Sequence, residues 1–284
     1  MDKNKFIKEL FYVLSCQLGK EVEMKQKRVW KNNGASYEGL VIEKLEEELS
    51  PVISLDKCYE DFEAGISMKE ISEQVLKEYR KTAGKVSLLS QQDIWSYERI
   101  KDRLYVEIVN KEWNKQYLEH KYYVPFLDLA VVYYIDTQAD YKDAPSHRGT
   151  AVTKEIFKIW SVEPEVIWKQ VLENMEKESR FLMVIVTEKE NSLITFEDAF
   201  QKNQGALTLL QRGILDEAKE KIGESFYILP VSIFELMIVP ESQADEVEEM
   251  KKAIIESNTE IPAEYLLSNS VYYYREKGEV EIAG

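Results

Sequence analysis

The most apolar stretch of this chain, Phe226–Pro240 (FYILPVSIFELMIVP), constrains the fold more than any other segment. Two short hydrophobic runs flank Pro230-Val231-Ser232, and a proline closes the second run. Short apolar runs that are bounded by proline are typical of buried strands rather than of helices. We therefore predict two buried strands here, or one bent strand, at the centre of a domain.

The charge of the chain argues against several classes of partner. Its 284 residues include 52 acidic and 37 basic side chains, which give a net charge of −15. This excess repels nucleic-acid phosphates and anionic lipid headgroups, because clustered lysine and arginine provide most of the affinity for both. The longest basic cluster, Lys25–Arg28 with Lys31, is short and lies in a strand-like segment. We expect neither nucleic acid nor a membrane as a partner.

The cysteine content and the apolar segments favour a soluble, cytoplasmic protein. Only Cys16 and Cys58 are present, which argues against a disulfide framework. The pattern places Cys16 among the core residues of a helix and Cys58 in a polar loop. The N-terminus has no signal-like pattern, and no segment reaches the ~20 apolar residues that a membrane-spanning helix needs.

The N-terminal half predicts a small antiparallel sheet packed on a helix. Apolar residues recur at helical spacing over residues 6–18. Two strand-like segments, residues 21–30 and 37–42, flank the turn sequence Asn32-Asn33-Gly34, which tolerates positive φ angles. Residues 51–55 follow as a third strand, and three strands on the first helix are the economical arrangement.

Helices and strands continue to residue 136. Ser67 and Glu70 have the spacing of a capping box, and an apolar helical face follows them. Asp128 interrupts a long apolar run, where a carboxylate is either a buried functional acid or, more commonly, a strand-end residue that bonds to backbone amides. Helices are expected over residues 94–101 and 110–120, and strands over residues 104–109 and 124–135, the last a central strand that is apolar on both faces.

The polar segment 137–149 is the candidate boundary between two lobes, because few of its residues suit a core. We predict an α+β fold with mixed or antiparallel sheets and packed helices. Its parts are an N-terminal α+β lobe over residues 1–136, a linker or long loop over 137–149, and a C-terminal α/β lobe over 150–284. The alternation of elements lacks the regular period of a doubly wound sheet.

The C-terminal lobe carries the remaining predicted elements. Helices are expected over residues 153–160, 163–177, 213–222 and 245–257. Strands are expected over residues 181–187, 192–196 and 205–210, besides the apolar stretch described above and a terminal hairpin over 270–275 and 279–283.

Residues that commonly carry catalysis or bind metals are few and scattered. The two histidines, His120 and His147, are far apart, and neither has a cysteine or carboxylate at ligand spacing. The sequence contains no nucleophile elbow, phosphate-binding loop or dinucleotide fingerprint. We therefore predict no metal, no cofactor and no catalytic residue.

The 17 tyrosines are more suggestive, because several stand next to one another. Tyrosine is favoured on binding surfaces, since its ring buries area while its hydroxyl keeps a polar contact. The alternative is that one ring of each run enters the core and the next lies at the surface. On the first interpretation Tyr122, Tyr133 and Tyr273 form a possible interaction surface.

Five short motifs occur in a distinctive order along the chain. Lys31–Gly34 forms a Lys-Asn-Asn-Gly turn, Gly39–Ile42 a Gly-Leu-hydrophobic strand, and Ser50–Ile53 a Ser-Pro strand. Pro125–Ala130 reads Pro-Phe-Leu-Asp-Leu-Ala, and Leu267–Tyr272 reads Leu-Ser-Asn-Ser-Val-Tyr. Together they resemble a family of uncharacterised bacterial proteins, the domain of unknown function 5688. The resemblance spans nearly the whole chain, and it implies a shared fold but no activity.

One motif of that family differs here. The family's Tyr-Ile-Leu-Pro-Ser-Ser-Ile-His-Glu corresponds to Tyr227–Glu235, with Val231 in place of its first serine and Phe234 in place of its histidine. A catalytic or ligating histidine would mean a function lost in this chain, whereas a packing residue is acceptably replaced by phenylalanine. The family-motif positions whose role is open are Asn32, Asn33, Gly34, Asp128, Ser232 and Glu235.

Scant catalytic residues, abundant tyrosine and strong negative charge favour a non-catalytic protein-binding or adaptor protein. An inhibitor of a basic protein, similar in role to an immunity protein, is one concrete version. The alternative is a hydrolase-type enzyme whose site assembles between the two lobes, from carboxylates or from Cys58 and His147. The sequence leaves the identity of the partner and the oligomeric state open.

Overall fold

The computed structural model describes residues 1–44, 52–82, 89–137, 149–178, 181–188, 191–198, 205–275 and 279–284. The chain forms two compact units. Unit 1 comprises residues 1–31 and 35–93, and unit 2 comprises residues 32–34 and 94–284. The described residues form helices and three antiparallel sheets, which confirms the predicted α+β class.

Unit 1 contains a three-stranded antiparallel sheet in the order β1-β2-β3. β1 (Val22–Trp30) and β2 (Ser36–Lys44) pair along their whole lengths, with Val22 opposite Lys44 and Trp30 opposite Ser36. β3 (Val52–Ser54) pairs with the middle of β2. The predicted three-stranded sheet is confirmed.

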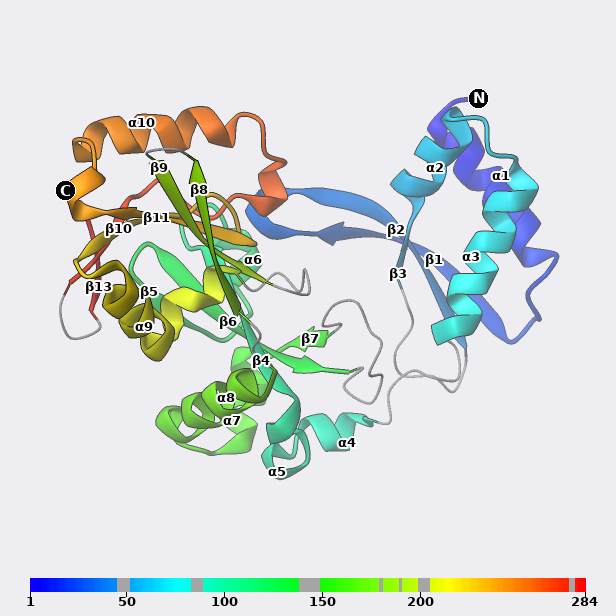
Figure 1. Cartoon of the computed structure of the whole chain (residues 1–284). Helices are drawn as coiled ribbons and strands as arrows, with labels where there is room; N and C mark the ends of the chain where they lie inside the picture. Colours follow the sequence, from blue (N-terminus) through cyan, green and yellow to red (C-terminus); the bar gives the residue numbers. More distant parts are fainter. Residues whose placement is uncertain are drawn as a thin grey trace. The chain divides into compact units, whose positions relative to one another are not determined.

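Three helices, α1 (Lys3–Ser15), α2 (Leu55–Glu63) and α3 (Met68–Thr82), pack against this sheet (Figure 1). The predicted capping box starts α3: the Ser67 hydroxyl accepts the Glu70 amide at 3.3 Å, and the Ser67 amide donates to the Glu70 carboxylate at 3.1 Å. The helices and the sheet share one core of buried residues, Phe6, Ile7, Leu10, Leu14, Leu40, Ile42, Leu55, Cys58, Ile71, Val75, Leu76 and Tyr79.

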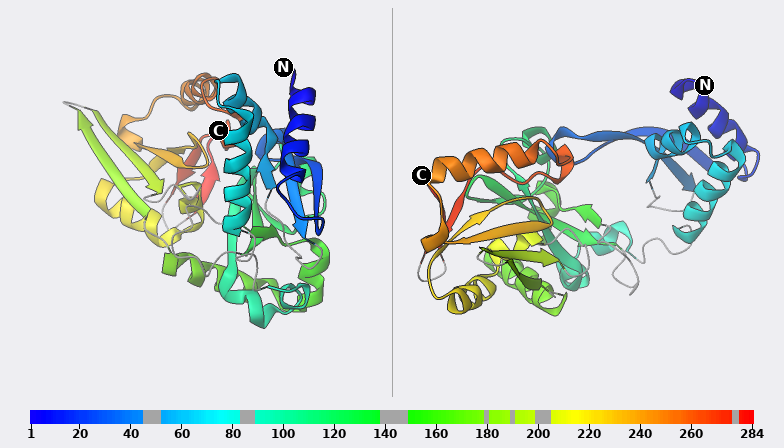
Figure 2. Two further views of the ribbon diagram at one scale, coloured as in Figure 1. Left: turned by 90° about the vertical axis from the view of Figure 1, so that its right-hand side faces the viewer. Right: turned by 45° about the horizontal axis from the view of Figure 1, so that its top comes forward.

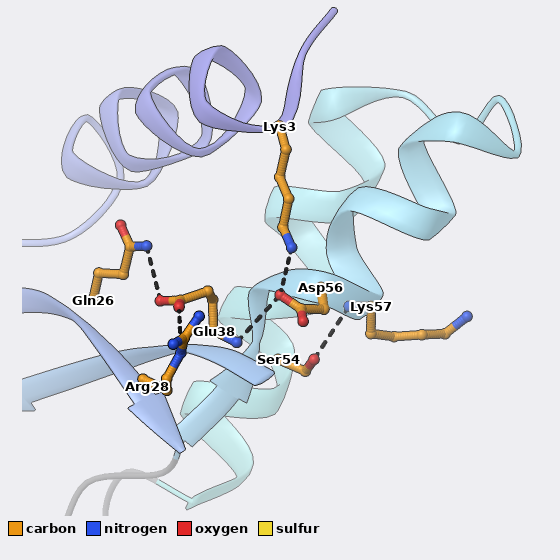
Figure 3. Close-up of polar contacts among 7 residues, drawn as sticks. All are labelled: Lys3, Gln26, Arg28, Glu38, Ser54, Asp56 and Lys57. Carbon is orange, nitrogen blue, oxygen red and sulfur yellow. Dashed lines mark hydrogen bonds and ion pairs between the residues drawn. The ribbon is translucent and has the colours of Figure 1, made fainter. Parts of the chain in front are cut away.

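Asp56, in the first turn of α2, joins three elements of unit 1 (Figure 3). Its carboxylate accepts the backbone amide of Glu38 in β2 at 3.2 Å and lies 3.0 Å from the Lys3 ammonium of α1. The Glu38 carboxylate in turn accepts from Gln26 at 3.0 Å and Arg28 at 3.3 Å, both in β1. These partly exposed contacts orient the elements more than they stabilise the fold.

Unit 2 contains a four-stranded antiparallel sheet whose central strand is β6 (Leu129–Asp136). β6 pairs with β4 (Leu104–Asn110), with β5 (Tyr123–Phe126) and with β7 (Gly149–Ala151). Every residue of β6 is buried, as expected of a strand that is covered on both faces.

Helices cover both faces of this sheet. α8 (Pro164–Glu178) covers one face, where the rings of Trp168 and Tyr133 lie 6.3 Å apart. On the other face, Tyr117 and Leu118 of α6 (Lys115–Leu118) pack against Val132 and Tyr134. The remaining helices of this part of the chain are α5 (Tyr97–Ile100), the 3-10 turn η2 (Lys101–Arg103) and α7 (Lys154–Trp160). The short helix α4 (Gln91–Ile94) contains the last three residues of unit 1 and the first of this stretch of unit 2.

Three predictions for this part of the chain were wrong in detail. The apolar run 124–135 is two strands, because the chain turns between Phe126 and Leu129, where Leu127 has a φ of 54°. The helix expected over residues 94–101 is broken between α4 and α5. The helix expected over residues 110–120 is a turn followed by the short α6.

The second sheet of unit 2 has six antiparallel strands in the order β13-β12-β10-β11-β9-β8. Two of its inner strands are β10 (Phe226–Leu229) and β11 (Glu235–Pro240), which confirms the prediction of two buried strands in the most apolar stretch. The others are β8 (Phe181–Glu188), β9 (Asn191–Asp198), β12 (Tyr272–Tyr274) and β13 (Val280–Ile282). β12 and β13 form the predicted terminal hairpin.

One long helix, α10 (Val247–Asn258), lies along the six-stranded sheet (orange in Figure 2). Its Met250 and Ile254 share a core with Leu229, Val271 and Ala283. The other elements are η3 (Gly205–Leu210), α9 (Arg212–Ile222), η4 (Glu241–Gln243) and η5 (Ala263–Tyr265). Residues 205–210 were predicted as a strand, but they form the 3-10 helix η3.

The division into units differs from the predicted lobes. Apart from residues 32–34, the chain passes from unit 1 to unit 2 between residues 93 and 94, rather than at the predicted linker over 137–149. The reason is that β6 ends at Asp136 and β7 begins at Gly149, so the predicted linker joins two strands of one sheet. Residues 138–148 lie outside the described residues.

Among the described residues, no helix combines the length and the apolar character that crossing a membrane requires.

Candidate functional site

Three of the family motifs, those that contain Asn32–Gly34, Asp128 and Ser268–Tyr272, meet in unit 2, around the segment that runs from η5 to β12. We call this meeting point the polar junction. Its members are Asn32, Asn33, Asn110, Asn114, Asp128, Ser268, Ser270 and Tyr272, together with the backbone of residues 263–267.

Asn33 shows why the turn sequence Asn-Asn-Gly is needed at this point. Asn33 and Gly34 have φ angles of 56° and 73°, which asparagine and glycine adopt most readily. This backbone directs the Asn33 amide group to the carbonyl oxygens of Ala263 and Leu266, at 2.7 and 2.8 Å. Asn32 donates to the Glu264 carbonyl at 3.0 Å. The turn therefore holds the backbone of residues 263–266 in place.

Two further asparagines, which sequence reasoning missed, complete this part of the junction. Asn114 is buried, and its side-chain oxygen accepts the Asn33 backbone amide at 2.7 Å. Its amide group donates to the side-chain oxygens of Asn32 and Asn33 at 2.8 and 2.7 Å. Asn110, also buried, donates to the Leu267 carbonyl at 3.3 Å. An asparagine pair four residues apart after a buried strand is the only signal that the sequence offered.

Asp128 forms the second part of the junction. Its carboxylate accepts three hydroxyl groups, from Ser268 at 2.5 Å, Tyr272 at 2.7 Å and Ser270 at 3.0 Å. The prediction that this carboxylate bonds to backbone amides was wrong, since it accepts from the hydroxyl groups of side chains 140 to 144 residues away in the sequence. Burial, and then the charge of Asp128, raise the pKa of the Tyr272 hydroxyl, which therefore remains a donor.

The motif that departs from the family pattern lies beside the junction. The Ser232 hydroxyl accepts the Phe234 amide at 3.1 Å, and the Ser232 amide donates to the Glu235 carbonyl at 3.1 Å, so both positions shape the turn before β11. The Phe234 ring packs on Tyr265 of η5, with centroids 5.0 Å apart. Phe234 thus makes an aromatic contact at the position where the resemblance implies a histidine.

Hydrogen bonds within the protein account for the polar atoms of the junction. The amides of Asn33 and Asn114 and the carboxylate of Asp128 each have at least two partners in the fold. A buried network with satisfied members specifies one backbone arrangement. We interpret these family-motif positions as residues that shape unit 2.

The tyrosines proposed as an interaction surface lie in different surroundings. Tyr133 is only 2% exposed beneath α8, so it is not a surface residue. Tyr122 is half-buried and stacks on Phe157, with ring centroids 3.4 Å apart. Tyr273 is half-buried and packs on Tyr227 at 4.9 Å. The run Tyr272-Tyr273-Tyr274 follows the alternative interpretation, with the outer two rings in the core.

The two cysteines lie opposite to prediction. Cys16 is exposed at the end of α1, whereas Cys58 is buried in α2 within the core of unit 1. Burial raises the pKa of the Cys58 thiol to about 11, so it holds little thiolate at neutral pH. This argues against Cys58 as the nucleophile of a hydrolase. His147, its suggested partner, lies outside the described residues.

The acidic excess is concentrated around α10. Residues 241–264 contain eight acidic residues and two lysines, a net charge of −6 within 24 residues. Both lysines pair within the helix, Lys251 with Glu248 at 2.9 Å and Lys252 with Glu249 at 2.6 Å. The exposed carboxylates, which we call the α10 acidic surface, are Glu241, Asp245, Glu246, Glu248, Glu249, Glu256 and Glu260.

The polar junction fixes the end of this surface. The backbone that accepts from Asn32 and Asn33 begins at Ala263, three residues after Glu260. Ile255, on α10, is 50% exposed and adds an apolar contact point among the carboxylates. In the described part of the chain, no three His, Cys, Asp or Glu residues are placed to hold a metal ion together.

The fold and the junction define an α+β protein in which three sequence motifs that are far apart in the chain meet at one place. The model of a family of unknown function, DUF5688, matches residues 3–276. The chain therefore belongs to this family, as the motifs had indicated. No curated protein and no solved structure matches the chain.

Proposed function

We propose that this protein acts by binding another protein, one with a basic surface, through the α10 acidic surface. The observation that carries the proposal is the concentration of exposed carboxylates on one helix and its flanking turns, with Ile255 exposed among them. An adaptor or an inhibitor of a basic protein would both use such a surface.

The carboxylates of this surface carry the same charge and repel one another at short range. A basic partner would relieve that repulsion and would be attracted over a distance of about one Debye length, ~10 Å at 0.1 M salt. Complementary charge raises the rate of association and restricts the choice of partner. Ile255 would supply apolar area that remains attractive at high salt.

The first experiment is capture of partners from the native host by the tagged protein at low salt. The proposal predicts a stoichiometric partner with a basic surface, released as the salt rises toward 1 M, where the Debye length is only ~3 Å. Recovery of the free protein alone under these conditions would count against it.

A matched pair of variants separates the α10 acidic surface from the overall charge. The α10 triple variant carries D245N, E246Q and E256Q, which neutralise three exposed carboxylates of this surface. The control triple variant carries E9Q, E21Q and E73Q, which remove the same charge from exposed positions in unit 1. The α10 triple variant should capture clearly less of the partner than the control does. Equal retention by both would contradict the proposal.

A further inference from the structure

The strand β8 lies at one edge of the six-stranded sheet of unit 2. It pairs with β9 along all eight of its residues, and no other described strand pairs with it. β11 pairs with β9 only over Ile194–Glu197, so the turn end of the β8–β9 hairpin extends beyond β11, as the left view of Figure 2 shows. About half of the backbone N–H and C=O groups of β8 therefore point away from β9, toward the edge of the sheet.

The sequence of β8 suits pairing with a further strand. Phe181–Thr187 (FLMVIVT) contains no charged residue, no proline and no glycine, and the single charged residue of the strand is Glu188 at its end. β-branched and aromatic residues favour extended backbone. A long apolar edge of this kind is a template for pairing with another chain, because its outer backbone groups have no strand beside them.

The other edge strands of the described sheets have features that oppose such pairing. β1 contains Lys25, Lys27 and Arg28, and β5 contains Pro125, which has no amide hydrogen to donate. β3, β7 and β13 are only three residues long, and β13 also contains Glu281. β4 is buried along nearly its whole length. Among the described edge strands, β8 alone is long and, up to its last residue, without charge or proline.

We propose that β8 is a homodimer interface, where it pairs in antiparallel fashion with β8 of a second copy of this chain. With the two strands fully overlapped, Phe181 of one copy lies opposite Glu188 of the other, and the two six-stranded sheets join into one. Strands of this length form about eight backbone hydrogen bonds, close to the roughly ten of a typical protein interface. The outermost strands of the joined sheet are then the two copies of the short β13.

Charge is the reason to expect a second copy rather than a different protein. The net charge of −15 on each chain opposes self-association, so two copies meet most easily through a segment without charge, such as Phe181–Thr187. The two Glu188 carboxylates would lie at opposite ends of the paired strands, ~24 Å apart and beyond the ~10 Å Debye length at 0.1 M salt. A basic partner, in contrast, finds carboxylates on α10 and none within this run.

The dimer would leave the α10 acidic surface free. The core beneath α10 includes Leu229 of β10 and Ala283 beside β13, and these strands are separated from β8 by β9 and β11. Self-pairing through β8 and binding of a basic protein through α10 therefore use different parts of unit 2, and the two proposals can fail independently.

Sedimentation velocity of the full chain over a range of concentrations tests the dimer. The proposal predicts a reversible dimer, with a mass that approaches twice the 33.3 kDa of one chain at tens of micromolar. Ile185→Lys places in the middle of β8 the kind of charge that β1 carries, and Ile282→Lys makes the same change on β13, where Ile282 is 42% exposed. Ile185→Lys should raise the dimer dissociation constant at least about tenfold, and Ile282→Lys should change it by less than about twofold.

Hydrogen exchange of the wild-type protein gives a second readout, which holds even where Ile185→Lys disturbs the hairpin. Dilution from tens of micromolar to well below the dissociation constant should speed the exchange of about half of the amides in residues 181–188, while residues 280–282 keep their rate. A monomer at every concentration would overturn the proposal. So would a dimer that keeps its wild-type affinity in a folded Ile185→Lys variant, or one in which dilution leaves the exchange of residues 181–188 unchanged.

Discussion

Replacing Asp128 by alanine should destabilise unit 2, because three hydroxyl groups depend on this carboxylate. Ser268 and Tyr272 are fully buried, so each loses a partner that water cannot replace. Leaving a buried donor unsatisfied costs about 1–3 kcal/mol. Ser270 is half-buried and can turn to solvent. We therefore expect Asp128→Ala to lower the free energy of unfolding by about 2–5 kcal/mol.

Asparagine retains one acceptor oxygen at this position, so Asp128→Asn should cost about half as much as alanine. Tyr272→Phe removes one donor and should cost about 1–2 kcal/mol. Because Asp128 and Tyr272 are in contact, their double variant should be less destabilised than the sum, with a coupling energy of about 1–2 kcal/mol. The exposed Asp245 provides the control, since Asp245→Ala should stay within about 0.5 kcal/mol of the wild type.

Urea unfolding followed by the fluorescence of the five tryptophans measures these energies. The m-value should be compared among variants, so that a change in stability is not confused with separate unfolding of the two units. A loss below about 0.5 kcal/mol for Asp128→Ala, or strict additivity with Tyr272→Phe, would refute the reasoning that the junction determines the fold of unit 2.

Three further outcomes are expected. Gly205→Ala should cost about 3 kcal/mol in urea unfolding, because a Cβ atom at this position would overlap the backbone carbonyl of Phe234; wild-type stability would contradict that close approach. In Cys16→Ser, the buried Cys58 should react with Ellman's reagent only after denaturation, whereas fast native reaction would show an accessible thiol. The pKa of Lys121 is lower in the folded state (about 8) than the ordinary ~10.4 of the unfolded chain, so its buried charge opposes folding most below pH 8. Lys121→Met should therefore gain stability over the wild type at pH 7, with the gain shrinking as pH rises toward 10.4; a gain independent of pH would contradict this sign.

Local patterns predicted much of the fold. The capping box at Ser67 and the Asn-Asn-Gly turn were read correctly, because both depend on residues next to one another in the chain. The two strands of the most apolar stretch were predicted for the same reason. The turn at Leu127 was missed, since leucine at a positive φ gives no turn signal and the apolar run continues through it. Residues 205–210 are apolar enough for a strand, yet tertiary packing makes them a 3-10 helix.

The polar junction could not be predicted from the sequence alone. Residues that are hydrogen-bonded to each other there are separated by up to 234 positions, as Asn32 and Leu266 are. Their pairing depends on the topology of unit 2, which local patterns do not encode. The motif resemblance singled out Asn32, Asn33 and Asp128, but it gave no reason to connect them with Asn110 and Asn114.

The most direct test of the proposed function is the dissociation constant of the purified complex, measured by calorimetry for the wild type and both triple variants. Three neutralised carboxylates at about 0.5 kcal/mol each predict roughly a tenfold weaker complex for the α10 triple variant at 0.1 M salt. The control triple variant should stay within about twofold of the wild type, and the difference should shrink at 1 M salt. Equal affinities for the two variants at low salt would contradict binding through the α10 acidic surface.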